Sequence, residues 1–466
     1  LYSSAASDVY KRQSLACGLA KARDLKGGHE NIIAVIGDGS LSGGEAYEGL
    51  SNAGEMGTNL IIVVNDNEMS IAENHGGLYQ NLKELRDTEG RSSCNFFRSL
   101  GLDYLYVGEG NDIPSLVAAF AKVKDTSRPT VVHIHTQKGK GYAPAEADRE
   151  EFHWEMPFDL ETGKPKVDCS GMEDYHSLTG KFLLEKMKED HTVVAISSGT
   201  PTVIGFTPER RKQAGRQFVD VGIAEEHAVA LASGIAAGGG RPVYGVYSTF
   251  IQRCYDQLSQ DLCINGNPAV ITVFMGTVAG MNDVTHLGFF DIPLISNIPN
   301  MVYLAPTCSE EYFAMLEWAV RQTEYPVAIR VPGVAVVHRK EEFDTDYSEL
   351  NRYKMTARGE TVAILALGSF YDLGQALKNK LREESGVEAT LINPRYITGL
   401  DEPMLEELKV GHRIVVTLED GVLDGGFGEK IARYYGNSEM RVLNYGLRKE
   451  FADRYNLDEL MKANRL

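Results

Sequence analysis

Short apolar runs alternate with helical patterns along most of the chain, beginning at residue 32. IIAVIG (32–37) is followed by an amphipathic segment, GGEAYEGLSNAGEMG (43–57), and then by a second apolar run, NLIIVVND (59–66). Two β-branched runs joined by a helical segment form the pattern of a βαβ unit, in which parallel strands are covered on both faces. The sequence therefore predicts an α/β protein.

Two interruptions divide this alternation into three blocks. EMPFDLETGKPKVDCSGMED (155–174) has the Glu, Pro and Gly content of a linker, and HRKEEFDTDYSELNRYKMTARGE (338–360) is a charged segment. A chain of 466 residues is also too long for a single compact core. We predict three doubly wound α/β domains at residues 1–165, 172–335 and 355–466.

The first residues do not fit this organisation. LYSSAASDVYKRQ (1–13) has neither a helical nor a strand period, whereas the following SLACGLAKARDL has the pattern of a helix in the middle of a domain. We therefore predict that residues 1–13 are a non-native leader. The first domain is expected to begin without its usual N-terminal part.

Composition excludes several functional classes. The chain has 47 Lys and Arg against 65 Asp and Glu, a net charge of −18, so no excess of positive charge is available for nucleic acid or an anionic membrane. Its six cysteines show no C-x-x-C pairing, as is typical of a reducing compartment. No apolar run approaches the roughly 18 residues that span a bilayer. We expect a cytoplasmic protein that binds neither nucleic acid nor membrane.

The first predicted strand ends in GDGSLSGG (37–44), at the edge where α/β sheets bind phosphate groups. An acid repels a bare phosphate, so Asp38 suits this place mainly if a divalent cation lies between its carboxylate and a pyrophosphate. One βαβ step later, the next strand ends in Asn65, Asp66 and Asn67, which offer further oxygen ligands. The alternative is that Asp38 caps the next helix and the asparagines form a turn.

This pair of motifs resembles the pyrophosphate and magnesium motif of thiamine-diphosphate enzymes. The resemblance implies that Asp38 and Asn67 bind Mg²⁺ through their side chains and that Met69 binds it through its backbone carbonyl. It also implies that Gly39 and Ser40 contact the diphosphate.

A thiamine enzyme also needs a carboxyl group in an apolar pocket beside the pyrimidine ring of the cofactor, where it supports proton removal from the thiazolium. Glu225 stands at a predicted strand-to-helix junction in DVGIAEEHAVALASGIA (220–236). Alternatively, an acid at this place interacts favourably with the N-terminal end of the helix dipole, and we retain this role for Glu226.

The strings around these residues are similar to the 1-deoxy-D-xylulose-5-phosphate synthase family from about residue 14 to the end of the chain. They include KGKGYAPAE (138–146), YSTFIQRCYDQ (247–257) and LEDGVLDGGFGE (418–429). The resemblance implies a homodimeric, transketolase-like transferase that uses thiamine diphosphate and Mg²⁺. Such an enzyme joins two carbons of pyruvate to glyceraldehyde 3-phosphate with loss of CO₂, for isoprenoid and thiamine biosynthesis. Its active site lies between the first two domains.

The same resemblance assigns roles to individual residues. Glu225 would activate the aminopyrimidine, Phe250 would stack on that ring, and Tyr142 would line the cofactor site. His286 would move a proton to or from the acceptor. The remaining substrate-side positions are Tyr247, Arg253, Lys138, His153 and Asn282. Each has an ordinary alternative, such as core packing for Tyr247 or a helix-surface charge for Arg253.

The sequence departs from the family pattern at the acceptor's phosphate site. Met275, or a close neighbour, stands where an arginine is expected, Asn282 replaces a usual aspartate, and Gly333 falls at or near a second lost arginine. Neither Met nor Gly can replace the bidentate fork of an arginine. The family's N-terminal segment is also absent, and without it we expect weak cofactor binding.

Three other interpretations remain open at this stage. The first is a transketolase-like paralogue with a different donor or a non-phosphorylated acceptor, which the lost arginines favour. The second is a nicotinamide-binding oxidoreductase built on the glycine-rich turn, although that would require an acid at the end of the second strand and no magnesium. The third is a thiamine-binding protein without catalytic activity.

Overall fold

A computed structural model describes residues 9–155, 157–167 and 171–466. Most of the expected leader, residues 1–8, lies outside the described residues. The chain forms two compact units. The first comprises the chain up to Met172 together with Ser198–Thr200 and Asp220–Ala224, and the second comprises Glu173–Ser197, Pro201–Val219 and Glu225–Leu466.

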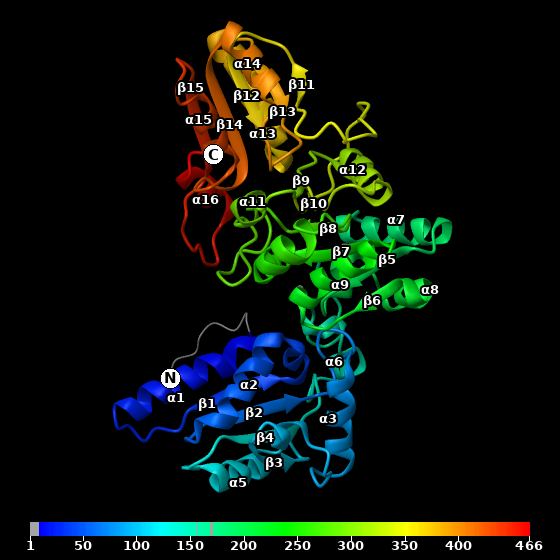
Figure 1. The fold of residues 1–466 in the computed structure, drawn as a ribbon, viewed down its shortest axis with the longest axis vertical. Helices are drawn as coiled ribbons and strands as arrows, with labels where there is room; N and C mark the ends of the chain where they lie inside the picture. The colour runs from blue at the N-terminus through cyan, green and yellow to red at the C-terminus, as the bar shows by residue number, and fades with distance from the viewer. Residues whose placement is uncertain (1–8, 156, 168–170) are drawn as a thin grey trace. The chain divides into compact units, whose positions relative to one another are not determined.

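Within the described residues, the first unit contains a parallel four-stranded sheet in the order β1-β2-β4-β3 (Figure 1). The strands are β1 (Ile33–Gly37), β2 (Ile61–Asp66), β3 (Asp103–Val107) and β4 (Thr130–His135). The helices are α1 (Arg12–Leu25), α2 (Gly44–Met56), α3 (Gly77–Asp87), α4 (Phe96–Ser99), α5 (Ile113–Val123) and α6 (Ala143–Ala147). Short 3-10 helices are η1 (Val9–Lys11), η2 (Asp38–Ser42) and η3 (Glu151–His153).

Strand β2 is buried on both faces, as expected for the centre of a parallel sheet. Ile62 and Val64 belong to a core that includes residues of α1 and α2, whereas Ile61 and Val63 pack with residues of α5. Alternate side chains of a strand point to opposite faces, so a continuous apolar run is needed when helices cover both. This is why NLIIVVND shows no polar alternation.

The second unit begins with a six-stranded sheet in the order β6-β5-β7-β8-β10-β9, counted over the described part of the chain, in which the pairs from β5 to β9 are parallel. The strands are β5 (Val193–Ser197), β6 (Phe218–Asp220), β7 (Arg241–Tyr247), β8 (Val270–Phe274), β9 (Val302–Leu304) and β10 (Val327–Arg330). The α-helices are α7 (Tyr175–Glu189), α8 (Pro208–Ala214), α9 (Glu225–Ala237), α10 (Ser248–Ile251), α11 (Asp291–Ser296) and α12 (Ser309–Arg321). The short helices are η4 (Pro201–Ile204), η5 (Gly215–Gln217), η6 (Gln252–Cys254) and the π-helix η7 (Gln257–Cys263).

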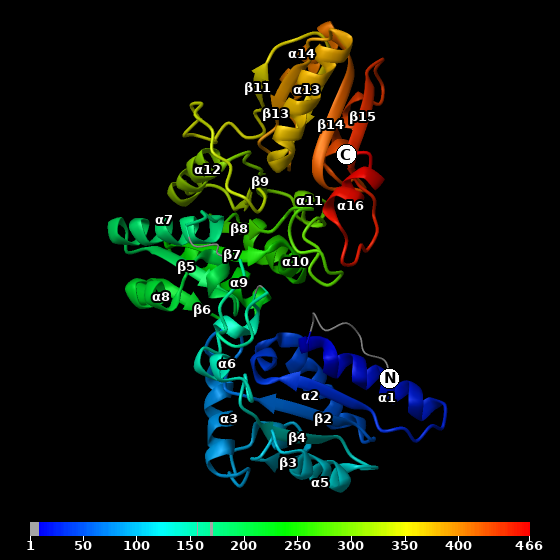
Figure 2. The same cartoon turned by 180° about the vertical axis from the view of Figure 1, so that it is seen from behind.

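The same unit continues into a five-stranded sheet in the order β11-β13-β12-β14-β15, again over the described residues; β11 pairs antiparallel to β13 and the other pairs are parallel (Figure 2). Its strands are β11 (Lys354–Ala357), β12 (Thr361–Ala366), β13 (Thr390–Asn393), β14 (His412–Val422) and β15 (Arg441–Leu447). Its helices are η8 (Gly368–Phe370), α13 (Tyr371–Ser385), α14 (Glu402–Gly411), α15 (Phe427–Tyr435) and α16 (Leu457–Ala463).

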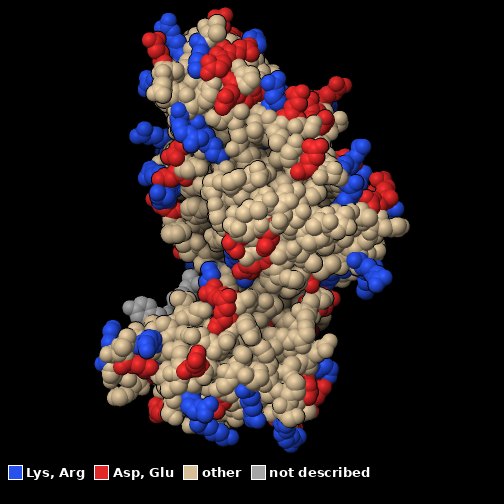
Figure 3. Space-filling model, in the orientation of Figure 1, with Lys and Arg blue, Asp and Glu red and all other residues tan. Residues whose placement is uncertain are grey.

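The prediction of doubly wound α/β domains is confirmed by these sheets and the helices between their strands. The first two sheets fall inside their expected residue ranges, and the third begins at Lys354, one residue before its range; the domain bounds stay a prediction. None of the described helices is long and apolar enough to cross a membrane. On the face drawn in Figure 3, acidic and basic side chains are interspersed.

Candidate active site

The first candidate site lies where β1 and β2 end. The two strands are in register, so that Gly37 pairs with Asn65 and the residues after each strand are neighbours. The carboxylate of Asp38 accepts a hydrogen bond from the backbone of Asn67 and another, at 2.6 Å, from Nδ2 of Asn74. The structure therefore brings Asp38 and Asn67 together.

The environment of Asp38 is unfavourable for a bare carboxylate. Burial, followed by the charge of Asp66, raises the pKa of Asp38 to about 7, against the opposing hydrogen bonds of Asn74 and Asn67. Oδ1 of Asn74 is buried and has no hydrogen-bond partner among the described residues. A bound cation would stabilise the ionised form of Asp38 and could use such an oxygen.

A cation here would need oxygen ligands that are not carboxylates. Among the described residues, no group of three His, Cys, Asp or Glu side chains is placed to hold a metal ion. Asp38 supplies one carboxylate, and the predicted partners Asn67 and Met69 offer an amide and a backbone carbonyl. Carboxylate, carbonyl and phosphate oxygens are the set that Mg²⁺ takes, so the residues present fit this ion. Oδ1 of Asn67 now accepts a hydrogen bond from the Met69 amide at 3.2 Å.

Gly39 allows the loop after β2 to approach the turn after β1. A Cβ atom on Gly39 would lie 2.7 Å from both Cβ and Oγ of Ser70. The hydroxyl of Tyr79, from α3, donates to the carbonyl oxygens of Asp38 and Gly39 at 3.2 Å each. Ser40 is buried beside them in η2. This turn is therefore held from two sides, and only glycine leaves room for Ser70.

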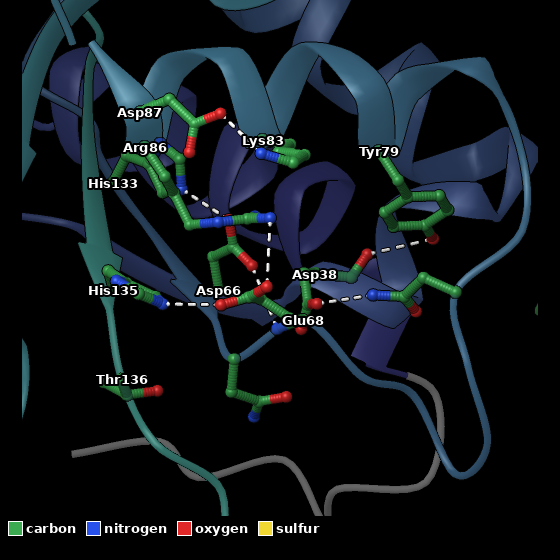
Figure 4. Close-up of polar contacts among 12 residues, drawn as sticks. Asp38, Asp66, Glu68, Tyr79, Lys83, Arg86, Asp87, His133, His135 and Thr136 are labelled. Atoms are coloured by element: carbon green, nitrogen blue, oxygen red, sulfur yellow. Dashed lines mark hydrogen bonds and ion pairs between the residues drawn. The ribbon is translucent and has the colours of Figure 1, made fainter. Parts of the chain in front are cut away.

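Asp66 belongs to a buried charge network behind the turn (Figure 4). Its Oδ2 accepts hydrogen bonds from Nε2 of His133 at 2.9 Å and from Nη1 of Arg86 at 2.5 Å. Burial alone would raise the pKa of Asp66, but these two contacts outweigh it and the pKa is lowered. Glu68 extends the network to Arg86 at 3.4 Å and to His135 at 3.0 Å. Asp66 is thus an ionised acid that binds Arg86 and His133 behind the turn.

Lys138 and His153, expected on the substrate side, lie together near the same loop. Nζ of Lys138 donates to the carbonyl of Ser70 at 2.6 Å and lies 3.3 Å from Nδ1 of His153. Burial lowers the pKa of Lys138, although the charge of Asp38 opposes it, and burial followed by Lys138 lowers the pKa of His153. A neutral imidazole beside an ammonium group is an arrangement that can exchange a proton.

Tyr142 precedes α6 and lies in a group of aromatic rings. Its ring centroid is 5.7 Å from that of Phe152 and 5.9 Å from that of Phe158. The hydroxyl of Tyr142 is buried and has no hydrogen-bond partner within the described parts of the chain. A buried hydroxyl usually finds a partner, so this one is suited to a bound ligand.

The second candidate site lies in the other unit, at the start of α9. Glu225 is 3 % exposed and forms a close ion pair with Nη1 of Arg253. Nη2 of Arg253 also lies 2.9 Å from Oε2 of Glu226. Arg253 was expected to face the acceptor; in the structure, both neighbouring acids already bind its guanidinium.

A row of rings brings three predicted residues together. The centroid of Phe250 lies 5.8 Å from Tyr247 and 5.7 Å from His286. His176, from α7, lies 6.1 Å from Tyr247 and stacks on Phe274 at 4.7 Å. Burial raises the pKa of the Tyr247 hydroxyl and lowers that of His176. Sequence analysis did not single out His176, because one histidine on a helix gives no signal by itself.

His286 is oriented by an acid, Asp283, that sequence reasoning did not single out. Oδ1 of Asp283 lies 2.9 Å from Nδ1 of His286 and also accepts from the Thr285 hydroxyl. Burial would raise the pKa of Asp283, but these hydrogen bonds lower it. Asn282, which stays a predicted substrate-side residue, donates to the carbonyl of Tyr455 at 3.1 Å. The acid that binds His286 is therefore Asp283.

The backbone is left-handed at both positions where an arginine is lost. Met275 has a φ of +56°, and a Cβ atom on Gly288 would lie 1.9 Å from its carbonyl oxygen. Gly333 has a φ of +72°, which favours glycine. The nearby Arg330 is buried, with Nε 2.7 Å from Asp291.

Comparisons with known proteins were made over the whole chain. Residues 7–95 match the family model described as 1-deoxy-D-xylulose-5-phosphate synthase. Residues 173–336 match the transketolase pyrimidine binding domain, and residues 352–464 match the transketolase C-terminal domain. The three models thus cover parts of all three sheets.

Curated relatives and solved structures agree with these matches. A 1-deoxy-D-xylulose-5-phosphate synthase from Lachnoclostridium phytofermentans is 36% identical over 455 residues, covering 90% of this chain and 72% of the relative. One from Clostridium tetani is 36% identical over 488 residues, covering 96% and 78%. A transketolase structure from Pichia stipitis is 15% identical with a TM-score of 0.51, covering 98% of this chain and 78% of that one, and shows a likeness of fold alone.

Proposed function

Because the chain belongs to the 1-deoxy-D-xylulose-5-phosphate synthase family, we propose that it condenses pyruvate with glyceraldehyde 3-phosphate and releases CO₂. The product is 1-deoxy-D-xylulose 5-phosphate, a precursor for isoprenoids. The family assignment gives the reaction class, that of a transketolase-type transferase. The observation that best supports it is the buried Asp38, which meets Asn67 at the end of the sheet and whose pKa is raised to about 7 by burial and the charge of Asp66.

The residues of the first unit suit thiamine diphosphate and Mg²⁺. Asp38, Asn67 and the carbonyl of Met69 would hold the ion, while Gly39 and Ser40 would contact the diphosphate. When bound, the cofactor would supply the nucleophilic carbon that decarboxylation of pyruvate requires. The role of the chain is to fix the diphosphate end and to exclude water from the reacting end.

Glu225 has the position of a group that holds a proton for the cofactor's pyrimidine. It is buried at a helix start, and Arg253 fixes its carboxylate. Phe250 would pack against the pyrimidine, and Tyr142 would line the cofactor site with its unsatisfied hydroxyl. A carboxyl group fixed in this way contributes through general acid and base catalysis.

His286 would give a proton to the aldehyde oxygen of the acceptor as the new carbon–carbon bond forms. Asp283 binds Nδ1 of the imidazole at 2.9 Å, which leaves Nε2 for proton transfer. Tyr247 would face the acceptor from the same row of rings. Lys138 and His153 would serve the substrate side from the first unit.

The assembly and location are also part of the proposal. We infer a homodimer, which the family resemblance implies, and a cytoplasmic location, which six cysteines without C-x-x-C pairing indicate. Gel filtration with light scattering would measure the assembly directly. A mass of about 51 kDa, that of one chain, would contradict the dimer.

A second candidate function is a related enzyme that takes a non-phosphorylated acceptor. The observation that favours it is the engagement of both nearby arginines, since Arg253 is bound by Glu225 and Glu226 and Arg330 by Asp291. Met275 and Gly333 add no positive charge at the expected places. An acceptor phosphate would then have to compete for Arg253.

A coupled assay separates the two candidates. CO₂ release from pyruvate is measured with glyceraldehyde 3-phosphate and, separately, with glyceraldehyde as the matched acceptor without phosphate. Release that depends on glyceraldehyde 3-phosphate supports the first candidate. Equal or faster release with glyceraldehyde favours the second, and release with neither aldehyde contradicts both.

A further inference from the structure

The loop that carries His286 connects β8 to α11 and spans residues 275–290. Both of its ends are buried in the core of the third sheet, because Val278, Leu287 and Phe289 pack with residues of β12 and β14. Between them, residues 279–286 contain no helix or strand. The position of the imidazole therefore depends on contacts made by this middle part.

Two of these contacts come from side-chain carboxylates of the third sheet and of the C-terminal segment. The amide of Val278 donates to Oδ1 of Asp420 at 2.7 Å, and Ser369 holds the other oxygen of that carboxylate at 2.6 Å. The amide of Val284 donates to Oδ1 of Asp453 at 3.1 Å. One acid thus anchors the start of the loop, and another anchors the stretch just before His286.

Further contacts come from Tyr455 and its neighbour. The Tyr455 hydroxyl donates to the carbonyl oxygens of Val278 at 2.7 Å and of Met281 at 3.3 Å. The Arg454 amide donates to the carbonyl of Asn282 at 2.6 Å, and the Asn282 side chain returns a hydrogen bond to the carbonyl of Tyr455 at 3.1 Å. Figures 1 and 2 both show the segment before α16 beside this loop.

These contacts reduce the freedom of a segment that would otherwise be costly to order. Each residue fixed in a loop costs conformational entropy, and Gly280 lies in the middle of this one. Burial, followed by the charge of Asp420, raises the pKa of Tyr455 to about 12, so its hydroxyl remains a donor at neutral pH. The loop then keeps Asp283 and His286 in one arrangement.

We propose that residues 453–455 are a clamp that positions His286 for the acceptor step, with Asp453 and Tyr455 as its positioning residues. The clamp rests on the proposed role of His286, which would contact the acceptor itself. Asp453 and Tyr455 act through the loop backbone and would touch neither substrate nor cofactor. The C-terminal segment thereby tunes the acceptor step of an active site built by other elements.

Kinetics of Asp453→Ala and Tyr455→Phe test this clamp in the full chain. Each variant removes one anchoring group, so kcat/KM for glyceraldehyde 3-phosphate should fall about five- to tenfold. The KM for pyruvate should stay within about twofold, because the donor does not depend on His286. Asp453→Asn should restore most of the loss, since its amide oxygen can still accept from Val284.

Matched controls come from the same part of the chain. Asp458→Asn changes an acid in the first turn of α16, and Tyr434→Phe removes a hydroxyl that donates to Glu406. Neither residue contacts the loop in the hydrogen bonds of the structure. Both controls should leave acceptor kinetics unchanged.

Hydrogen–deuterium exchange of the loop peptide in the cofactor-free chain provides a readout that does not need activity. Exchange around Val278 and Val284 should rise about tenfold in Asp453→Ala and Tyr455→Phe and stay at the wild-type level in the controls. Unchanged exchange in both variants overturns the clamp. Faster exchange with unchanged acceptor kinetics overturns its role in the reaction. If the wild-type chain lacks activity, the proposed function fails, and the exchange data alone decide whether the clamp exists.

Discussion

Two acids at the ends of neighbouring strands have opposite environments, although their sequence contexts look alike. Asp38 is buried beside Asn74 and has its pKa raised to about 7, whereas Asp66 is bound by Arg86 and His133 and has its pKa lowered. The meeting of Asp38 and Asn67 could be predicted, because a βαβ step places adjacent strand ends together. The partners of Asp66 could not be predicted from the sequence, since Arg86 comes from α3 and His133 from β4.

Asp283 shows the same limit for a single residue. Asn282 was predicted as a substrate-side residue, and Asp283, which binds His286 in the structure, was assigned no role. Spacing within an irregular loop does not fix which side chain points inward, so the sequence pattern contained no signal for Asp283.

Replacing Asp283 with Ala should slow the acceptor step. Without the carboxylate, Nδ1 of His286 loses its charged partner, and we expect kcat with glyceraldehyde 3-phosphate to fall about 10- to 100-fold. Asp283→Asn retains an oxygen that can accept from Nδ1 and should recover part of the loss. Steady-state kinetics with both variants measure this. Equal activity of Asp283→Ala and the wild type would remove Asp283 from the mechanism.

At the scale of the elements, the turn after β1 depends on close packing against the loop after β2. A methyl group on Gly39 would meet Ser70 at 2.7 Å, so the loop must shift. Gly39→Ala should lower the free energy of unfolding by about 1–3 kcal/mol. It should also weaken binding of thiamine diphosphate with Mg²⁺ at least about tenfold, as measured by calorimetry.

Gly44→Ala is the matched control for this change. Gly44 begins α2 a few residues later, and nothing lies within 4 Å of the position of its added Cβ. The control should bind cofactor as the wild type does. Wild-type binding by Gly39→Ala would show that the two loops need not pack closely.

The core of the second sheet contains a pH-sensitive element, His176 on α7. Nδ1 of His176 lies 2.7 Å from the Val203 carbonyl, and burial lowers the pKa of the imidazole below its usual value of 6.5. As the pH falls through 6.5, the unfolded chain takes up a proton that the folded chain resists. Stability from this residue is therefore present at neutral pH and is lost in acid.

Urea unfolding at about pH 7.5 and pH 5.5 checks this direction. His176→Gln should lose less stability between the two values than the wild type loses. His29→Gln, a change at an exposed histidine, serves as the control. An identical loss of stability between the two pH values in His176→Gln and the wild type would contradict a lowered pKa of His176 in the folded chain.

Hydrophobic patterns predicted the strands well, because buried parallel strands are continuous apolar runs. Irregular features escaped this reasoning. The segment Gln257–Cys263 has an ordinary helical sequence pattern but forms a π-helix. The side chain type of Met275 likewise does not indicate its φ of +56°. Such features result from tertiary packing, which a local pattern does not contain.

At the scale of the whole molecule, a buried ion pair joins two sheets of the second unit. Arg330, at the end of β10, binds Asp291 through Nε at 2.7 Å and donates through Nη2 to the carbonyl of Asp420 on β14 at 2.5 Å. Removing one partner of a buried pair leaves the other charge uncompensated. Arg330→Met should lower the free energy of unfolding by about 3 kcal/mol.

Arg358→Met provides the comparison for this prediction. Arg358 pairs with Glu407 at 2.8 Å, but the two side chains are 72% and 52% exposed. An exposed pair contributes at most about 1 kcal/mol, so this variant should stay close to the wild type. Denaturant unfolding of both variants measures the difference. Similar small losses would mean that the two sheets are held together by apolar packing.

Three α/β blocks could be predicted from the two interruptions of the pattern, and the resemblance supplied the candidate site residues, whose roles stay predictions. Their grouping into two compact units could not be predicted. Ser198–Thr200 and Asp220–Ala224 belong to the first unit although their neighbours in the chain belong to the second. This grouping depends on contacts between residues distant in sequence.

Exchange of the thiazolium C2 proton of thiamine diphosphate, bound with Mg²⁺, measures the proton transfer assigned to Glu225. The wild-type chain should accelerate exchange over the free cofactor, and Glu225→Gln should slow it at least about 100-fold, with a dissociation constant within about threefold of the wild type. Wild-type exchange in Glu225→Gln, or no cofactor binding by either protein, would refute this role of Glu225.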